Sequence, residues 1–324
     1  MANNVVKVNS IAIADIAKIN GQNDADLVKL NGEEFASYGG ITWSTDDAAP
    51  TTGSTIKMGI VGAQTILGSD SGGKATYEHN GSSWSTTGSC SASHGAGVGG
   101  GTQNAGVIFG GWTGSDDSNA TEEYGGTSWS TGNNMVQSSA YMCGGGTVQT
   151  AQLCTGGSQY NPTVRDLPMT QTYDGTNWAN EGVNSSGHGS GGAGESGGGG
   201  LDAWLLTNGA LDSPGVQSSC QLFDQSAGTW TSKAATNTKV RYFGSSTDGT
   251  RVYKIGGYDA PGFTETAVVE SWVENTWTVE NSLPAARRMG GWGSGGSEAA
   301  GGASNIAGAG SSGAVNTYYT AAAS

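Results

Sequence analysis

The chain has 324 residues and a formal charge of −14, and it carries only 13 Lys and Arg against 27 Asp and Glu. That balance argues against nucleic acid as a partner, because phosphate binding requires a basic face. No apolar run approaches the roughly 20 residues that cross a bilayer, and the N-terminus lacks a secretory signal. We therefore expect synthesis in the cytoplasm and no membrane insertion, with a chain that stays soluble there or is released by lysis.

Glycine contributes 58 residues, a bias that by itself is typical of disordered or low-complexity chains. Ten Trp and eleven Tyr argue for a folded chain, because burial of aromatic side chains offsets the entropy that is lost on ordering. These aromatic residues recur at regular intervals within polar, Gly-rich sequence, which indicates a repeat.

The first 34 residues contain an eleven-residue repeat three times without gaps, whose matching segments begin eleven residues apart, at 5–10, 16–21 and 27–32. Each unit ends in Asn followed by Ser or Gly, which favours a chain reversal, so each is a short helical turn or a strand before a tight turn. Units this short cannot bury their own apolar side chains. The arm, residues 1–34, therefore packs on its own domain or docks into a larger assembly. The apolar side chains available for docking are Val8, Ile16, Ile19, Leu27 and Leu30.

A longer repeat organises residues 35–324, which we expect to form one domain. Its signature is an aromatic residue, a short turn rich in Gly, Asn or Asp, and then Trp, as in 124–129 and 173–178. Such a block predicts a β-hairpin whose outer strand carries the Trp. The Trp residues of the six copies are Trp43, Trp84, Trp129, Trp178, Trp230 and Trp277. Their separations of 41 to 52 residues match four-stranded propeller blades, so six copies predict six blades.

We take Tyr38 and Tyr77 as the aromatic residues of the first two copies. Pairs of Gly end the strands before the block, as in 106–111, and we expect them where inner strands crowd around a central channel. The six Trp would fill the wedge between adjacent sheets on the outer side. The C-terminal aromatic strand, 314–319, has no Trp strand after it. Residues 41–45 supply that strand and would close the ring.

The Gly pair, the aromatic strand after it and the Trp one turn later resemble the kelch repeat, over roughly residues 36–320. The resemblance implies an all-β fold, a six-bladed kelch-like β-propeller that is closed by an N-terminal strand and preceded by a short repeat arm. The arm resembles the leading segments of virion proteins from tailed phages, especially marine ones. That likeness implies a virion structural protein attached to tail, tail fibre or capsid, with other virion proteins and further copies of itself as partners. Its exposed loops would serve host attachment through a surface glycan or protein.

The titratable residues show no pattern of a catalytic, cofactor or metal site. His79, His94 and His188 lack metal-ligand spacing. We expect each to face solvent or the core edge, with His79 in a blade turn and His94 in a Ser- and Gly-rich strand. Asp46-Asp47 and Asp116-Asp117 fall in turn-like sequence, where Asp caps local backbone amides, with weak calcium binding as the alternative. We therefore interpret the chain as non-enzymatic, without cofactor or metal. A cellular kelch-type interaction scaffold and a carbohydrate-active propeller enzyme remain the alternatives.

The four Cys are too few and too scattered for a disulfide scaffold or a paired zinc site. We expect buried, reduced thiols, with a disulfide between Cys143 and Cys154 across a hairpin as the alternative. Trp112, Trp204 and Trp292 lie outside the repeat signature and could stack on glycans or pack between blades.

Overall fold

In the computed structural model of the chain, residues 74–159, 165–183, 216–247, 251–259, 264–273 and 275–286 are described, together with Pro50 and the strands given below. These residues form strands and no helix, and the strands pair almost entirely antiparallel. The predicted all-β fold class is therefore confirmed. A helix long and apolar enough to cross a membrane is not found in this part of the chain.

Six larger sheets form along the described chain. The first contains β8 (Thr55–Ile60), β9 (Ala63–Gly68), β10 (Thr76–His79) and β11 (Trp84–Thr87), with β32 (Gly291–Trp292) parallel to β8. The second contains β12 (Val98–Thr102), β13 (Ala105–Phe109), β14 (Thr121–Tyr124) and β15 (Trp129–Thr131). The third contains β16 (Cys143–Val148), β17 (Ala151–Thr155), β20 (Thr170–Tyr173) and β21 (Trp178–Asn180).

The fourth sheet contains β22 (Gly192–Glu195), β23 (Ala203–Ala210), β24 (Val216–Asp224) and β25 (Thr229–Lys233). The fifth contains β27 (Gly244–Thr247), β28 (Val252–Ile255), β30 (Val269–Val273) and β31 (Thr276–Val279). The sixth contains β33 (Ala303–Ala307), β34 (Val315–Ala322) and β7 (Tyr38–Asp46). Two short pairs lie between longer strands: β18 (Ser158–Gln159) with β19 (Arg165–Asp166), and β26 (Val240–Arg241) with β29 (Tyr258–Asp259).

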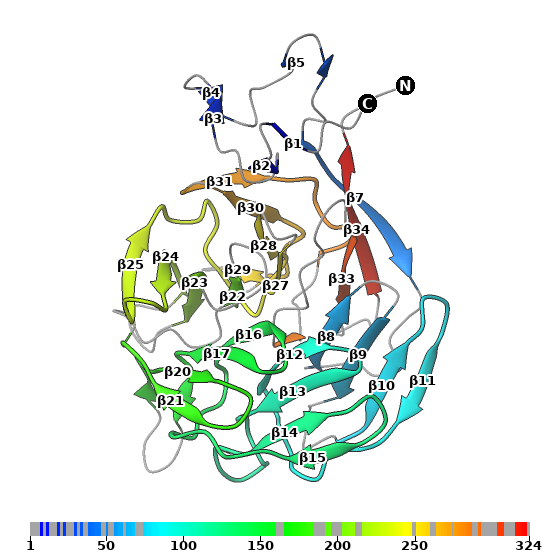
Figure 1. Ribbon diagram of the computed structural model, residues 1–324, viewed down its shortest axis with the longest axis vertical. Helices are drawn as coiled ribbons and strands as arrows, with labels where there is room; N and C mark the ends of the chain where they lie inside the picture. Colours follow the sequence, from blue (N-terminus) through cyan, green and yellow to red (C-terminus); the bar gives the residue numbers. More distant parts are fainter. Residues whose placement is uncertain are drawn as a thin grey trace.

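The first strands of the sheets contact one another in chain order. β12 contacts β8 and β16, β22 contacts β16 and β27, and β33 contacts β27 and β8. Figure 1 shows the sheets grouped around a common centre, in an order that follows the colour bar. The hydrophobic core lies between neighbouring sheets: Ile56 and Met58 of the first pack with Ile108 of the second, and Leu153 of the third packs with Phe223 of the fourth.

The predicted hairpins form in the first five sheets, where the last two strands are an antiparallel pair with the Trp on the outer one. Residues that face each other are Tyr124 and Trp129, Tyr173 and Trp178, Phe223 and Trp230, and Trp272 and Trp277. The copy assigned to Tyr38 and Trp43 is wrong as a hairpin, because both residues lie on the single strand β7. Trp43 instead faces Tyr318 of β34, since β7 pairs with the C-terminal strand.

The Gly pair at 110–111 meets two requirements. Gly110 and Gly111 follow β13 and have φ angles of 64° and 99°, so they form a left-handed turn at the end of the strand. They are crowded as well, because a Cβ on Gly111 would lie 2.7 Å from the carbonyl oxygen of Gly95. Other glycines, in the first strands, are crowded without such a turn. A Cβ on Gly100 of β12 would lie 2.5 Å from the carbonyl oxygen of Gly146 in β16, so a side chain there would collide with the neighbouring sheet.

Each of the three arm units contains a small antiparallel hairpin, which decides for the strand and against the helical turn. The pairs are β1 (Lys7–Val8) with β2 (Ile11–Ala12), β3 (Lys18–Ile19) with β4 (Gln22–Asn23), and β5 (Lys29–Leu30) with β6 (Glu33–Glu34). Val8, Ile19 and Leu30 each end the first strand of a hairpin. Ile16 and Leu27 lie outside the described residues.

Candidate functional site

The indole N–H groups of the repeat reach back to the preceding sheet. Three donate to a Thr hydroxyl at the start of that sheet's aromatic strand: Trp129 to Thr76 at 2.8 Å, Trp178 to Thr121 at 2.9 Å, and Trp230 to Thr170 at 2.9 Å. Trp43 and Trp277 donate to backbone carbonyl oxygens, those of Asn281 at 2.8 Å and Ala234 at 3.0 Å. Each bond therefore ties one sheet to the sheet before it.

We expect Thr121→Val to lower the free energy of unfolding by about 1–3 kcal/mol, because valine keeps the shape of threonine but leaves the Trp178 N–H without its acceptor. In a double-mutant cycle with Trp178→Phe, the two changes should couple by about 1 kcal/mol, as measured by urea unfolding. Thr131→Val, on an exposed face of β15, is the matched control and should change stability by less than about 0.5 kcal/mol. Additive effects of the two changes would contradict the assignment.

A second recurring feature lies one residue further along the aromatic strands. Glu122 is the second residue of β14 and Gln171 the second residue of β20, and both side chains are buried. The Gln171 side-chain oxygen accepts the backbone N–H groups of Val136 at 2.8 Å and Gln137 at 3.2 Å. Those amides belong to the segment that leads from the second sheet to the third. Gln171 therefore fixes the connection between two sheets.

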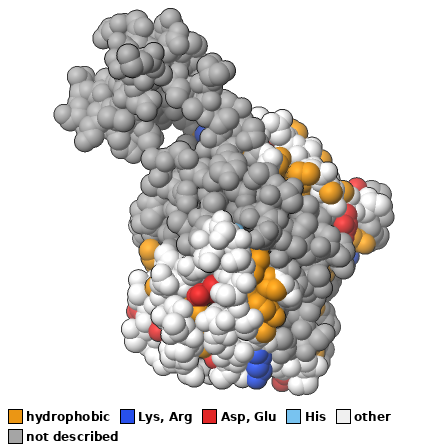
Figure 2. Space-filling model, turned by 90° about the vertical axis from the view of Figure 1, so that its right-hand side faces the viewer, with side chains coloured by type: hydrophobic (Ala, Val, Ile, Leu, Met, Phe, Trp, Pro, Cys, Tyr) orange, Lys and Arg blue, Asp and Glu red, His pale blue; other side chains and the backbone are white. Residues whose placement is uncertain are grey.

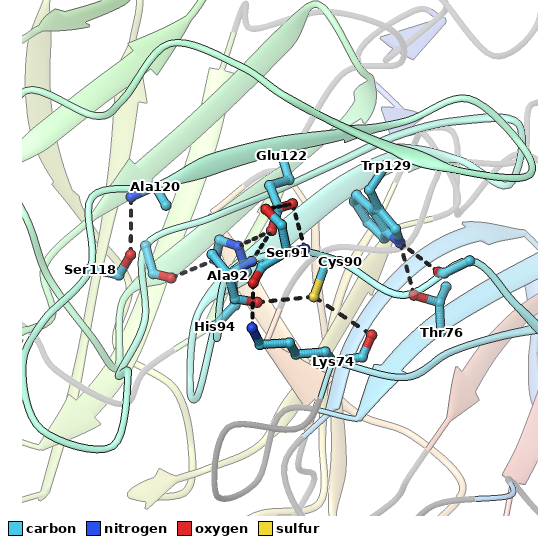
Figure 3. A network of polar contacts seen from close by, with 12 residues as sticks. Lys74, Thr76, Cys90, Ser91, Ala92, His94, Ser118, Ala120, Glu122 and Trp129 are labelled. Atoms are coloured by element: carbon cyan, nitrogen blue, oxygen red, sulfur yellow. Dashed lines mark hydrogen bonds and ion pairs between the residues drawn. The ribbon is translucent and has the colours of Figure 1, made fainter.

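Glu122 holds the preceding connection, from the first sheet to the second, with four hydrogen bonds (Figure 3). Its Oε1 accepts the backbone N–H of Ser91 at 2.8 Å and the Ser91 hydroxyl at 2.7 Å. Its Oε2 accepts the N–H of Ala92 at 2.9 Å and lies 3.1 Å from Nε2 of His94. The other ring nitrogen of His94, Nδ1, lies 2.8 Å from the carbonyl oxygen of Gly110. We call these five residues the second-sheet clamp.

The clamp holds charge in a dry place, since the side chains of His94 and Glu122 are 0% and 3% exposed. The Glu122 carboxylate and the Gly110 carbonyl oxygen only accept hydrogen bonds, and the two ring nitrogens of His94 face these two groups. Burial opposes ionisation of Glu122, but hydrogen bonds from His94, Ser91 and Ala92 outweigh it and lower its pKa to about 2. A carboxylate with this pKa takes up protons weakly near neutral pH. The chemistry suits Glu122 to holding the chain in place.

Cys90 and Lys74 lie beside the clamp. The Cys90 thiol donates to the carbonyl oxygen of Ala92 at 3.1 Å, and the Lys74 ammonium donates to that of Ser91. Burial, with a smaller contribution from the charge of Glu122, raises the pKa of Cys90 to about 12. The thiol therefore stays protonated near neutral pH and lacks the thiolate character of a nucleophilic cysteine.

In the fifth sheet, an ion pair holds the connection that leads into the sheet. Glu270 is the second residue of β30, and its Oε2 lies 2.6 Å from Nζ of Lys254, with the two side chains 0% and 1% exposed. The Lys254 ammonium also donates to the carbonyl oxygen of Thr238 at 2.9 Å and to its hydroxyl at 2.7 Å. Burial lowers the pKa of Lys254, and Glu270 opposes this shift. Glu270 thus holds the segment from the fourth to the fifth sheet through a lysine.

The expected positions of His79 and His94 are wrong. His94 is 0% exposed and lies outside the strands, in the connection to the second sheet. His79 is the last residue of β10, 1% exposed, and it faces Trp84 with ring centroids 4.9 Å apart. His79 therefore takes the place that Tyr124 takes opposite Trp129, and Tyr77 lies two residues earlier on the strand. Counting five residues back from each Trp, as in 124–129, would have found it.

No family profile matches the chain. No curated protein matches it either. Among solved structures, the chain is similar to YjhT. The likeness covers 77% of this chain and 88% of YjhT, with a TM-score of 0.63 and 15% sequence identity. At this identity the likeness concerns the fold alone, and YjhT has a β-propeller-like fold.

The remaining acidic residues are found in different surroundings. Asp116 accepts the N–H of Asp117 at 2.9 Å within an exposed turn, as expected for local capping. Asp46 is the last residue of β7 rather than part of a turn, and Asp47 lies outside the described residues, as does His188. Within the residues that the structure describes, no three or more His, Cys, Asp or Glu side chains gather as metal ligands would.

The four cysteines are all free and buried, in agreement with the expected thiols. In the register of β16 and β17, Gly144 rather than Cys143 faces Cys154. Trp112, which lies between β13 and β14, is half-buried and forms a β-bridge with Gly95 in the connection from the first sheet to the second. Trp204 and Trp292 lie on β23 and β32, and the positions of their side chains are not described.

Proposed function

We propose that this protein is a non-enzymatic structural protein of a tailed-phage virion, with its arm as the attachment. The observation that carries the proposal is the arm itself: three hairpins with two-residue strands, which begin at Lys7, Lys18 and Lys29. Strands this short do not make a stable sheet alone, so the arm requires a protein surface. In Figure 1, β3, β4 and β5 lie outside the group of larger sheets, which favours a surface on another molecule. The likeness of the arm to leading segments of virion proteins supports a particle as that surface.

The body of the protein, in this proposal, is a six-bladed kelch-like β-propeller closed by β7. The cyclic order of contacts among the first strands supports six blades. Pairing of β7 with β34 supports closure by the N-terminal strand, as does burial of Ile41 of β7 against Tyr253 and Ile255 of the fifth sheet. A closed wheel has few open sheet edges and forms a rigid support for loops.

The loops would present a binding surface for a host-cell glycan or protein, while the arm contacts other virion proteins and further copies of the chain. On the side shown in Figure 2, the described surface carries scattered acidic and basic side chains among uncharged groups. Such a surface suits a neutral ligand better than phosphate. The buried polar clusters support a non-enzymatic role, because Glu122 and Glu270 are engaged in holding the connections between sheets.

The test is to purify particles by density gradient from lysates of cells that produce the protein, and to locate it by mass spectrometry and immunogold labelling. We expect the full chain in the particle band. The variant Val8→Asp/Ile19→Asp/Leu30→Asp should remain in the soluble fraction, because it places charge at the apolar position of each hairpin. Its melting temperature should match the wild type.

The matched control is Lys7→Gln/Lys18→Gln/Lys29→Gln, which changes polar residues on the same three strands and should still reach the particle band. Absence of the wild-type chain from particles would refute the proposal. Equal incorporation of the triple Asp variant would show that attachment does not depend on the arm.

A further inference from the structure

The arm and the sixth sheet are continuous along the chain. Only residues 35–37 separate the last arm hairpin, which ends with β6, from β7. Any pull that the arm receives from a partner is therefore transmitted first to β7. How β7 is held then decides whether the sixth sheet stays intact under such a pull.

β7 is held from two sides. It pairs antiparallel with β34 along its length, from Tyr38 opposite Ala322 to Asp46 opposite Val315. On its other side, the Asn281 side chain donates to the carbonyl oxygen of Ile41 at 2.7 Å, and the Trp43 indole donates to that of Asn281 at 2.8 Å.

The direction of these strands decides how a pull acts on them. The arm enters β7 at its Tyr38 end, whereas β34 is joined to β33 through its Val315 end, at the opposite end of the pair. Figure 1 shows β7 in blue and β34 in red side by side and antiparallel. A pull on the arm therefore slides the two strands past each other, and the hydrogen bonds between them share the force. A pull at neighbouring ends would instead open the bonds one at a time.

We propose that β7 is a strap that resists tension between the arm and the body of the protein. The source of that tension rests on the proposed attachment through the arm. The mechanical property itself belongs to the isolated chain. Failure of the strap and failure of the proposed function are therefore distinguishable, since the first is measured without particles.

The test is single-molecule pulling of the full chain in optical tweezers, with one handle inserted directly before Val315. The second handle is placed either at the N-terminus, which slides the strands, or at Pro50, just after β7, which peels them. Both handle variants are first compared with the wild type by thermal melting. We expect a first rupture force at least about twofold higher for the sliding geometry, because breaking many bonds together has a higher barrier than breaking them singly. Equal forces would overturn the proposal.

A second measurement keeps the test independent of handle insertion. Ser44 and Thr317 face each other in the register of β7 and β34, so Ser44→Cys/Thr317→Cys can be joined by oxidation. With handles at the N-terminus and C-terminal to β25, in the segment at Thr236, the first rupture should disappear on oxidation and return with a reductant. If the first rupture is unaffected by the crosslink, another part of the molecule yields first and the strap assignment is wrong.

Discussion

Replacing Glu122 by Ala is expected to lower the free energy of unfolding by about 3 kcal/mol or more, which removes a large part of the stability of a typical domain. The change leaves Nε2 of the buried His94 ring without its partner. It also takes the acceptor from the N–H groups of Ser91 and Ala92. Equilibrium urea unfolding at neutral pH measures the loss. Glu122→Gln should cost less, because the amide keeps one acceptor oxygen.

The same carboxylate makes stability depend on pH. Its pKa in the folded protein is about 2, below the ordinary value of 4.5, so the unfolded chain takes up this proton first as the pH falls. The stabilisation from Glu122 is complete above about pH 5 and is lost between there and about pH 2. The decrease in the free energy of unfolding between about pH 5 and pH 2 should be smaller for Glu122→Gln than for the wild type. Asp116→Asn, in an exposed turn, is the control and should follow the wild-type profile.

Parallel pH profiles of the wild type and Glu122→Gln would contradict the clamp. A small effect of Glu122→Ala would contradict it as well, because buried N–H groups that lose their acceptor destabilise the folded state.

Local patterns predicted the hairpins, because the aromatic residue, the turn and the Trp lie within a few residues of one another. In 173–178, a side-chain oxygen of Asp174 accepts the N–H groups of Thr176 and Asn177, at 2.8 and 2.6 Å. Such a turn depends only on its own residues. The pairing of β7 with the C-terminal strand was also foreseen, since an aromatic strand without a following Trp lacked a partner.

The clamps were not foreseen, because their partners are far apart in the sequence. Glu122 and His94 are 28 residues apart, and the loop amides that Glu122 binds carry no side-chain signal. The polar residue two positions before the aromatic one recurs as Glu122, Gln171, Gln221 and Glu270. Alone, such a residue in a strand is typical of an exposed face. Its burial becomes evident only when the sheets are placed side by side.

The glycines show a different limit. Sequence reasoning gave Gly110 and Gly111 one reason, close approach to a neighbouring segment, and missed the left-handed turn that they also form. Both a left-handed turn and close backbone contact require Gly, so the residue type does not distinguish them. Only the φ angle at the strand end, or the nearness of another strand, separates the two causes.

Lys254→Met is expected to lower the free energy of unfolding by about 3–5 kcal/mol, because it leaves the fully buried Glu270 carboxylate without its cation. The Thr238 carbonyl and hydroxyl lose a donor as well. Replacement of both charges by apolar side chains of similar size removes the uncompensated charge. The double variant Lys254→Met/Glu270→Leu should therefore be more stable than the single variant, by about 2 kcal/mol or more.

The second-sheet clamp and the Lys254–Glu270 pair should respond differently when both paired side chains are replaced by apolar ones. In the second-sheet clamp, His94→Phe/Glu122→Leu still leaves the Ser91 and Ala92 amides without their acceptor, so the double variant should recover little of the loss. In the fifth sheet, Glu270 contacts the segment at Thr238 only through Lys254. Glu270 therefore accepts no backbone N–H group there, and removing both charges takes no acceptor from a backbone amide. Urea unfolding of the two cycles, run side by side, measures the difference. Recovery in both cycles, or in neither, would mean that direct amide binding by Glu122 is not what separates the two clamps.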